Sequence, residues 1–179
     1  MSENARPRAG APAARTVGMV GLGNMGRALA ANLVGSGFDV VSHDVAGPAG
    51  SPDGATFVAD LDDLARRADV VVLSLPDGRA SEQVCRSLAA ARPRSVAYVV
   101  DTSTIGVDAA RSLDALLSAA GLGYVDAPVS GGVAGARART LSVMVAGPEA
   151  ACAAVGPVLA GLSDRRRRVG ERPGMAQAL

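Results

Sequence analysis

Short apolar runs alternate with segments of helical periodicity along most of the chain. An apolar run of strand length, followed by apolar positions three and four residues apart, predicts a strand and then a helix. The predicted strands are residues 16–21, 38–44, 56–59, 69–75, 95–101, 124–127 and 141–146, and the predicted helices are 25–36, 60–67, 81–91, 107–120 and 148–162. This alternation predicts consecutive βαβ units, which build a parallel sheet with helices on both faces.

The run from Asp69 to Leu75 is the clearest strand of the chain. A continuous apolar run, rather than an alternating one, is typical of a strand that helices cover on both faces. The 179 residues suit one domain and could hardly hold two of typical size. We therefore predict a single-domain α/β fold with a Rossmann-type, doubly wound, mostly parallel sheet over residues 16–168.

Two segments fall outside this rhythm. Residues 1–15 are rich in Ala, Pro and Arg without periodicity, which predicts a disordered, solvated tail. Four consecutive arginines occupy positions 165–168. We interpret them as a solvated turn, with a phosphate-binding cluster as the alternative.

The composition favours small-molecule chemistry. The formal net charge is +1, so no global charge attracts nucleic acid or an anionic membrane. No apolar run is long enough to span a bilayer, and the N-terminus has no secretory pattern. Cys85 and Cys152 lie far apart in Ala-rich segments, which predicts free thiols in a reducing compartment. We therefore expect a cytoplasmic protein.

The strongest chemical motif is a glycine turn between the first strand and the first helix. The residues Gly21-Leu22-Gly23-Asn24-Met25-Gly26 match the G-x-G-x-x-G pattern of dinucleotide-binding folds. The first glycine permits a tight turn, the second lets the backbone approach a pyrophosphate, and the third allows close packing of helix on strand. A glycine turn without a ligand is the alternative, and the order strand, glycines, helix, strand weighs against it.

Asp44 ends the second predicted strand about twenty residues after the glycines. A carboxylate at this position can accept hydrogen bonds from the adenosine ribose hydroxyls and repels a 2′-phosphate, so we expect NAD rather than NADP. His43 is the single histidine of the chain. A place on the rim of the site suits it better than catalysis.

Two further segments present hydroxyls and backbone amides. Ser130, Gly131 and Gly132 could form a nest for a small carboxylate, and a plain glycine loop is an equal alternative. Asp101 to Thr104 follows a predicted strand, at the sheet edge where ligands bind, yet Asp followed by hydroxyl residues is also an ordinary helix cap.

Taken together, these motifs resemble the β-hydroxyacid dehydrogenase family, in which 6-phosphogluconate dehydrogenases and imine reductases are more distant relatives. The resemblance runs from residue 16 to 179 and includes Leu75-Pro76, Asp-Thr-Ser-Thr-Ile at 101–105 and Asp-Ala-Pro-Val-Ser-Gly-Gly at 126–132. It implies that Leu75, Pro76 and Thr104 line the cofactor. It also implies that Ser103, Ser130, Gly131 and Gly132 bind the substrate.

The resemblance also implies parts that this sequence does not contain. The family's catalytic lysine would follow Leu179, and no lysine occurs in the chain. Residues 169–179 would begin the family's interdomain helix, after which an all-helical domain completes the substrate cleft. Arg139 departs from the family pattern by replacing a glycine, and Val107 and Ala176 depart at two other positions.

The leading hypothesis is an NAD(P)-dependent oxidoreductase that moves hydride between nicotinamide and a small 3-hydroxy acid or semialdehyde. The chain would be its cofactor-binding domain, with weak turnover alone, working as a homo-oligomer or with a separate chain that supplies the helical domain. A non-catalytic module that binds NAD and docks on a partner is one alternative, since Leu159, Leu162, Met175 and Leu179 would lack cover. A relative of the imine reductases is another.

Overall fold

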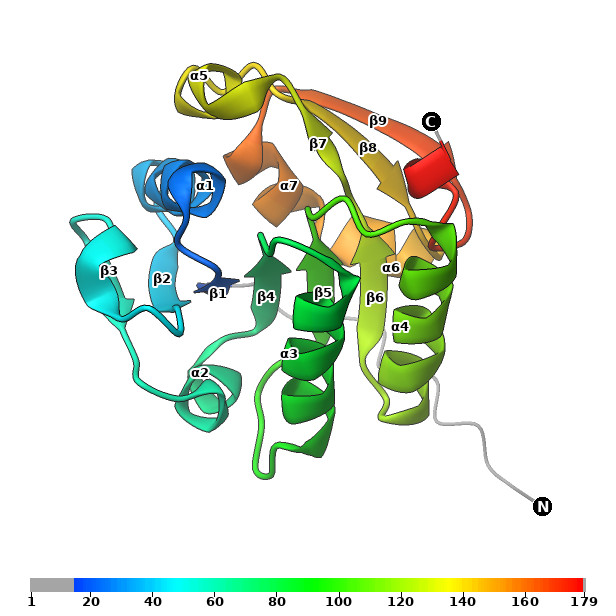
Figure 1. The fold of residues 1–179 in the computed structure, drawn as a ribbon, viewed down its shortest axis with the longest axis horizontal. Helices are drawn as coiled ribbons and strands as arrows, with labels where there is room; N and C mark the ends of the chain where they lie inside the picture. Colours follow the sequence, from blue (N-terminus) through cyan, green and yellow to red (C-terminus); the bar gives the residue numbers. More distant parts are fainter. Residues whose placement is uncertain (1–14, 179) are drawn as a thin grey trace.

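The computed structural model describes residues 15–178, which form one open sheet between two layers of helices (Figure 1). Except for Arg15, the tail expected at residues 1–15 lies outside this range, as does Leu179. The strands are β1 (Thr16–Val20), β2 (Asp39–His43), β3 (Ala55–Phe57), β4 (Val70–Leu73), β5 (Tyr98–Asp101), β6 (Gly123–Asp126), β7 (Val129–Ser130), β8 (Ser142–Ala146) and β9 (Arg165–Gly170). The α-helices are α1 (Asn24–Gly35), α2 (Leu61–Arg67), α3 (Gly78–Ala90), α4 (Val107–Ala119), α5 (Gly132–Arg137), α6 (Glu149–Ala154) and α7 (Gly156–Leu162), and the short 3-10 helices are η1 (Pro48–Gly50) and η2 (Ala176–Ala178).

The strand order confirms a doubly wound, mostly parallel Rossmann sheet. The strands lie in the order β3-β2-β1-β4-β5-β6-β8-β7, and β9 pairs with β8. All pairings from β3 to β6 are parallel, β8 is antiparallel to β6 and β7, and β9 is parallel to β8. The chain winds outward from β1 to β3 and then crosses back to β4. The order reverses between β1 and β4, where ligands bind outside the carboxyl ends of such strands.

A separate apolar core lies on each face of the sheet. On one face, Leu29 and Leu33 of α1 pack with Leu162 of α7. On the other face, where α3 and α4 lie in front of β4 to β6 in Figure 1, Leu64, Leu88 and Leu117 pack together. Because both faces are covered, the central strand β4 is buried along its whole length, as its continuous apolar run predicts. Among residues 15–178, no helix combines the length and the apolar character that crossing a bilayer requires.

The interpretation of residues 165–168 as a solvated turn is wrong. These arginines form most of β9, which pairs with β8 in the register Ser142↔Arg165 to Val145↔Arg168. The backbone of an edge strand is satisfied on one side by its neighbour, while long charged side chains extend into solvent, so charge does not prevent a strand here. After β9, the expected start of the interdomain helix shows only η2 within the described residues.

The single helix expected over residues 148–162 is divided in two. Pro157 stands in the first turn of α7, and Val155 ends α6. A proline inside a continuous helix would remove one hydrogen bond and clash with the carbonyl four residues earlier, so the chain begins a new helix instead. The expectation that Leu159 and Leu162 lack cover is also wrong, since they are 4% and 0% exposed. Met175, by contrast, is 43% exposed.

Two short elements of the segment between β6 and β8, namely β7 and α5, were not predicted. The turn that follows α5 contains Arg139, whose backbone has φ +59°. This left-handed conformation favours glycine, which explains why the resemblance places a glycine here. The guanidinium of Arg139 holds the turn against two other elements, donating to Ser36 Oγ at 2.8 Å and to the Ala160 carbonyl at 2.8 Å. Arg139 therefore combines a strained backbone with side-chain contacts that glycine cannot make.

Candidate functional site

The glycine turn between β1 and α1 is tightly packed on one side and open on the other. Gly21 has φ +92°, and a Cβ there would lie 2.2 Å from the Ser74 carbonyl oxygen. A Cβ on Gly26 would lie 1.9 Å from the Gly21 carbonyl oxygen. Gly23 has no atom within 4 Å of its Cβ position and is exposed. Two of the three glycines are therefore required by packing, and the third faces free space.

The N-terminus of α1 opens into the same space. Gly23 is its N-cap and offers no side chain to cap the helix, and the acceptor for the Arg27 N–H is the Gly23 carbonyl. The N–H groups of Asn24, Met25 and Gly26, in the first turn, have no acceptor within the helix. Free N–H groups and the positive end of the helix dipole together form a site for an anion such as a pyrophosphate.

Asp44 follows β2 immediately beside the glycine turn. Its Oδ2 accepts the Leu22 N–H at 2.6 Å and its Oδ1 accepts the Ala46 N–H at 2.8 Å. A carboxylate offers about four acceptor positions, so it can still accept hydrogen bonds from ribose hydroxyls. Next to it, the buried His43 has Nδ1 3.0 Å from the Val58 carbonyl oxygen, which holds the ring within the wall of the site.

These groups line one cleft of about 580 Å³. The predicted cofactor residues on its walls are Gly21, Gly23, Asn24, Met25, Gly26, Asp44, Leu75 and Pro76. Leu22 is buried behind the turn, with 4% of its surface exposed. Thr104 is exposed but does not belong to the lining. Further lining residues from α2 and α3, among them Leu61, Ala80 and Val84, give the cleft an apolar side.

Ser103 connects the carboxyl ends of β4 and β5. Its Oγ accepts the Leu75 N–H at 2.9 Å, and its own N–H donates to Asp101 Oδ1 at 2.9 Å. The side chain is buried and fixes the Leu75-Pro76 wall of the cleft. A substrate-binding role for Ser103 stays a prediction.

The proposed carboxylate nest lies apart from the lining of this cleft. Ser130 ends β7, Gly131 precedes α5 and Gly132 begins it, and all three are exposed. Gly131 and Gly132 have φ of +130° and +68°, which favours glycine at both positions. Their role in substrate binding also stays a prediction.

Sequence reasoning missed a buried polar cluster that holds the C-terminal segment. Gln177 Oε1 accepts the N–H groups of Ile105 and Gly106 at 3.0 and 3.1 Å, and Gln177 Nε2 donates to the Ser103 carbonyl and to Asp126 Oδ1 at 3.1 and 2.7 Å. Asp126 Oδ2 also accepts the Gly174 N–H at 2.9 Å. The family resemblance was the nearest signal for this cluster in the sequence, because it includes both the motif that begins at Asp126 and the segment 169–179 that contains Gln177.

Two carboxyl groups of this region are buried. Burial raises the pKa of Asp101 to about 6, against the hydrogen bonds from Ser103 that lower it. Burial also raises the pKa of Asp126, while the Gln177 amide opposes the rise. Tyr124 Oη lies 3.5 Å from Asp101 Oδ2, and burial raises the pKa of this phenol. These groups lie under the loop that carries Ser103 and Thr104, so they support the site rather than line it.

Comparison with known proteins now decides the family. Residues 16–170 match the family described as the NAD binding domain of 6-phosphogluconate dehydrogenase. The chain belongs to the β-hydroxyacid dehydrogenases, as their N-terminal NAD-binding domain. The fold and family expected from the sequence motifs are thereby confirmed.

The curated relatives of this family member are dehydrogenases. It is 38% identical over 168 residues to the mitochondrial 3-hydroxyisobutyrate dehydrogenase of Drosophila melanogaster, covering 92% of this chain and 52% of the relative. It is 43% identical over 148 residues to the probable 3-hydroxyisobutyrate dehydrogenase of Mycobacterium bovis, covering 80% of this chain and 50% of the relative. The chain thus spans about half the length of the curated relatives that it matches.

Solved structures support the same family assignment and the same fold. The 3-hydroxyisobutyrate dehydrogenase of Mycobacterium tuberculosis, solved with L-serine, superposes with a TM-score of 0.84 at 36% identity, covering 92% of this chain and 57% of that chain. The imine reductase of Streptomyces aurantiacus superposes with a TM-score of 0.78 at 24% identity, covering 91% of this chain and 58% of that chain. At that identity the second likeness shows the fold alone.

Proposed function

We propose that this chain supplies the NAD-binding half of an oxidoreductase that acts on a small 3-hydroxy acid or its semialdehyde. The observation that carries the proposal is the cleft itself, in which the open side of Gly23, the N-terminus of α1 and the carboxylate of Asp44 face one space. When bound, the nicotinamide cofactor supplies hydride donation or acceptance. The protein's part is to hold it against a substrate.

The individual roles follow from the geometry. The free N–H groups at the start of α1 would bind the pyrophosphate, and Asp44 would accept the adenosine ribose hydroxyls. The pocket wall formed by Leu75 and Pro76, which Ser103 positions, would exclude water from one side of the cofactor. The negative charge of Asp44 would disfavour the 2′-phosphate of NADP, so NAD is the proposed cofactor. By the resemblance, Ser130, Gly131 and Gly132 would bind the substrate carboxylate and Ser103 would contact the substrate. The names of the relatives, which are 3-hydroxyisobutyrate dehydrogenases, support a carboxylate as the substrate.

The resemblance implies that the proton that accompanies hydride transfer comes from the family's lysine, and no lysine occurs in these 179 residues. Relatives twice as long carry a second half, and the family's lysine would follow Leu179. We propose that the NAD-binding half works together with such a second half, and that the assembly is a homo-oligomer or includes a separate chain that supplies the helical domain. The free thiols Cys85 and Cys152 fit a reducing compartment, for which the cytoplasm is our proposal.

Calorimetric titration of the purified chain with NAD and, separately, with NADP tests the proposal. We expect saturable NAD binding and at least tenfold weaker NADP binding, because a 2′-phosphate would lie beside Asp44. Oxidation of 3-hydroxyisobutyrate by the chain alone should stay near background, since a general acid–base group contributes about 10²–10⁴-fold. Absence of binding to either cofactor at millimolar concentration would contradict the proposal.

A further inference from the structure

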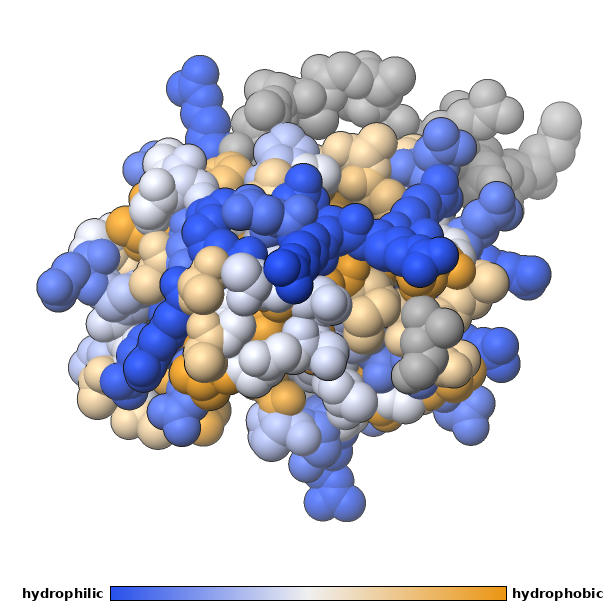
Figure 2. Space-filling model, turned by 90° about the horizontal axis from the view of Figure 1, so that it is seen from above, coloured by the Kyte–Doolittle hydropathy of each residue, from blue (hydrophilic) through white to orange (hydrophobic). Residues whose placement is uncertain are grey.

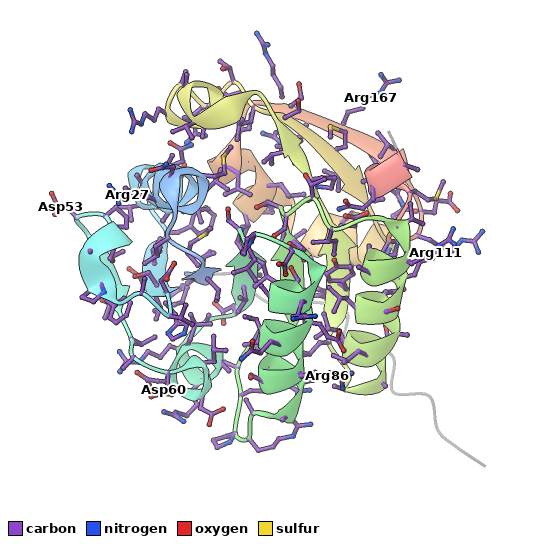
Figure 3. All side chains as sticks on the ribbon, viewed as in Figure 1. Arg27, Asp53, Asp60, Arg86, Arg111 and Arg167 are labelled. Atoms are coloured by element: carbon purple, nitrogen blue, oxygen red, sulfur yellow. The ribbon has the colours of Figure 1, made fainter. Side chains whose placement is uncertain are left out.

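The four arginines of β9 form a feature that the NAD site does not use. Arg165, Arg166, Arg167 and Arg168 are all exposed and stand at consecutive positions of one strand. Seen from above, Figure 2 shows strongly hydrophilic side chains gathered in a band across the face over β8 and β9. Figure 3 shows Arg167 projecting away from the body of the protein. The acidic residue that precedes the run, Asp164, pairs with Arg139 at 3.7 Å.

The arginines lie on both faces of the sheet, because side chains alternate along a strand. Arg166 and Arg168 share a hollow with Glu149 and Cys152 on the α6 side. Arg166 donates to the Ser163 carbonyl and Arg168 donates to the Gly147 carbonyl at 3.3 Å. Arg165 and Arg167 therefore lie on the opposite face, next to Ser142 and Met144 of β8.

β9 is also an edge strand. Within residues 15–178 it pairs with β8 alone, and beyond Gly170 the chain turns back to Asp126, where the Gly174 N–H is bound. Every second N–H and C=O of β9 consequently points outward, which is a template for pairing with a further strand. A second copy of β9 does not suit this edge, since pairing it would place four arginines opposite four arginines.

We propose that the β9 edge binds an extended acidic segment of a partner protein, which adds to the sheet as a further strand. Consecutive acidic side chains on such a strand alternate between its faces and so meet the arginines on both. The phosphate backbone of a nucleic acid would approach one face and reach only two of the four. Main-chain hydrogen bonds would supply binding, and the four arginines would select for acidic side chains.

Fluorescence anisotropy with a labelled peptide tests the proposal on the full chain. The probe is the hexapeptide Val-Glu-Glu-Glu-Glu-Val with blocked termini, and two other probes serve as comparisons. One, Glu-Pro-Glu-Glu-Pro-Glu, keeps the four glutamates and therefore the charge, but its two prolines prevent strand pairing. The other is a single-stranded oligothymidylate. We expect saturable binding of the first probe that weakens with salt, and much weaker binding of the other two.

Charge reversal then locates the site. The double variant Arg165→Glu and Arg167→Glu changes the two side chains on the face of β9 away from α6. It should weaken peptide binding roughly tenfold, since each exposed ion pair changes an equilibrium constant by up to about fivefold and two pairs are lost. The matched control Arg79→Glu and Arg111→Glu makes the same change in net charge at exposed positions on α3 and α4. At a salt concentration that screens the effect of net charge alone, this control should bind the peptide within twofold of the parent affinity. Equal losses in both variants, equal binding of the proline-containing peptide, tighter binding of the oligonucleotide, or no peptide binding would each overturn the proposal.

Discussion

The Asp44 carboxylate accepts the backbone N–H of Leu22 over 2.6 Å, and this bond joins the end of β2 to the glycine turn of β1. A second bond from the Ala46 N–H fixes the other carboxylate oxygen. The charged group is thus oriented before any ligand arrives, which reduces the conformational freedom lost on binding. This pre-organisation underlies the first prediction.

Replacing Asp44 with Asn should weaken NAD binding by about 10- to 100-fold. Hydrogen bonds to a charged group contribute about 1.5–3 kcal/mol, and tenfold in affinity corresponds to about 1.4 kcal/mol. The same change removes the charge that repels a 2′-phosphate, so NADP binding should stay constant or improve. Titration of both cofactors measures the ratio.

Asp53→Asn is the matched control for this variant. Asp53 is exposed and lies at the outer end of the loop before β3, where Figure 3 shows its side chain pointing away from the protein. Its loss should change neither affinity. An Asp44→Asn protein that binds NAD as the parent does would show that the carboxylate is not a ribose ligand.

The glycine turn allows binding and folding to be separated. Gly23→Ala keeps a permitted backbone, with φ −60° and ψ −173°, and meets no atom within 4 Å, so stability should change by less than about 0.5 kcal/mol. The methyl group enters the space proposed for the pyrophosphate, and NAD binding should fall at least tenfold. Gly26→Ala drives a methyl group to 1.9 Å from the Gly21 carbonyl oxygen and should cost about 3 kcal/mol or more of stability. Urea denaturation and NAD titration of both variants check this; full NAD affinity in Gly23→Ala would oppose the placement of the cofactor.

Two variants of Arg139 separate the cost of its left-handed backbone from the contribution of its guanidinium hydrogen bonds to stability. Arg139→Ala loses the guanidinium hydrogen bonds and keeps the left-handed backbone, so unfolding free energy should fall by about 2 kcal/mol. Arg139→Gly loses the same contacts but removes the backbone cost, which is about 1–2 kcal/mol. The glycine variant should therefore be the more stable of the two by about 1 kcal/mol. Equal unfolding free energies for the two variants would mean that φ +59° carries little strain.

The buried Asp101 predicts a pH dependence of stability. Its folded pKa of about 6 lies above the ordinary value of 3.8, so the folded state holds the proton more tightly than the unfolded state does. The contribution of this group is therefore complete below about pH 4 and is lost as the pH rises to about 6, with an upper limit of about 3 kcal/mol at 1.4 kcal/mol for each pKa unit.

Asp101→Asn isolates this effect from other carboxyl groups. The difference in unfolding free energy between the variant and the parent should move in favour of the variant from pH 4 to pH 6.5 and then remain constant. Urea denaturation at several pH values measures it, with Asp53→Asn as the exposed control. A difference that does not vary with pH would show that Asp101 titrates normally.

Local patterns in the sequence were sufficient to predict the central sheet and to bring the predicted cofactor residues together at one cleft. The continuous run of β4, the glycine order after β1 and the carboxylate that ends β2 are each visible in the sequence of one βαβ unit or less. The structure brings Gly21, Asp44 and Leu75 to one cleft. The parallel topology explains why these residues meet, because it places the carboxyl ends of neighbouring strands at one edge of the sheet.

The parts that could not be predicted depend on distant partners. Arg165 to Arg168 resemble a solvated turn in sequence, and only pairing with β8 makes them a strand. Likewise, nothing near Gln177 indicates that its amide binds Asp126, 51 residues away. The clearest local signal that was not used was Pro157, whose position inside an apolar helical pattern indicates a break.

The most direct test of the NAD site is a ¹⁵N–¹H chemical-shift titration of the chain with NADH. We expect the backbone amides from Leu22 to Arg27, together with those of Asp44 and Leu75, to shift in a saturable manner, while the amides of β9 remain unchanged. Saturable shifts centred elsewhere on the protein, with the glycine turn unaffected, would contradict the placement of the cofactor in this cleft.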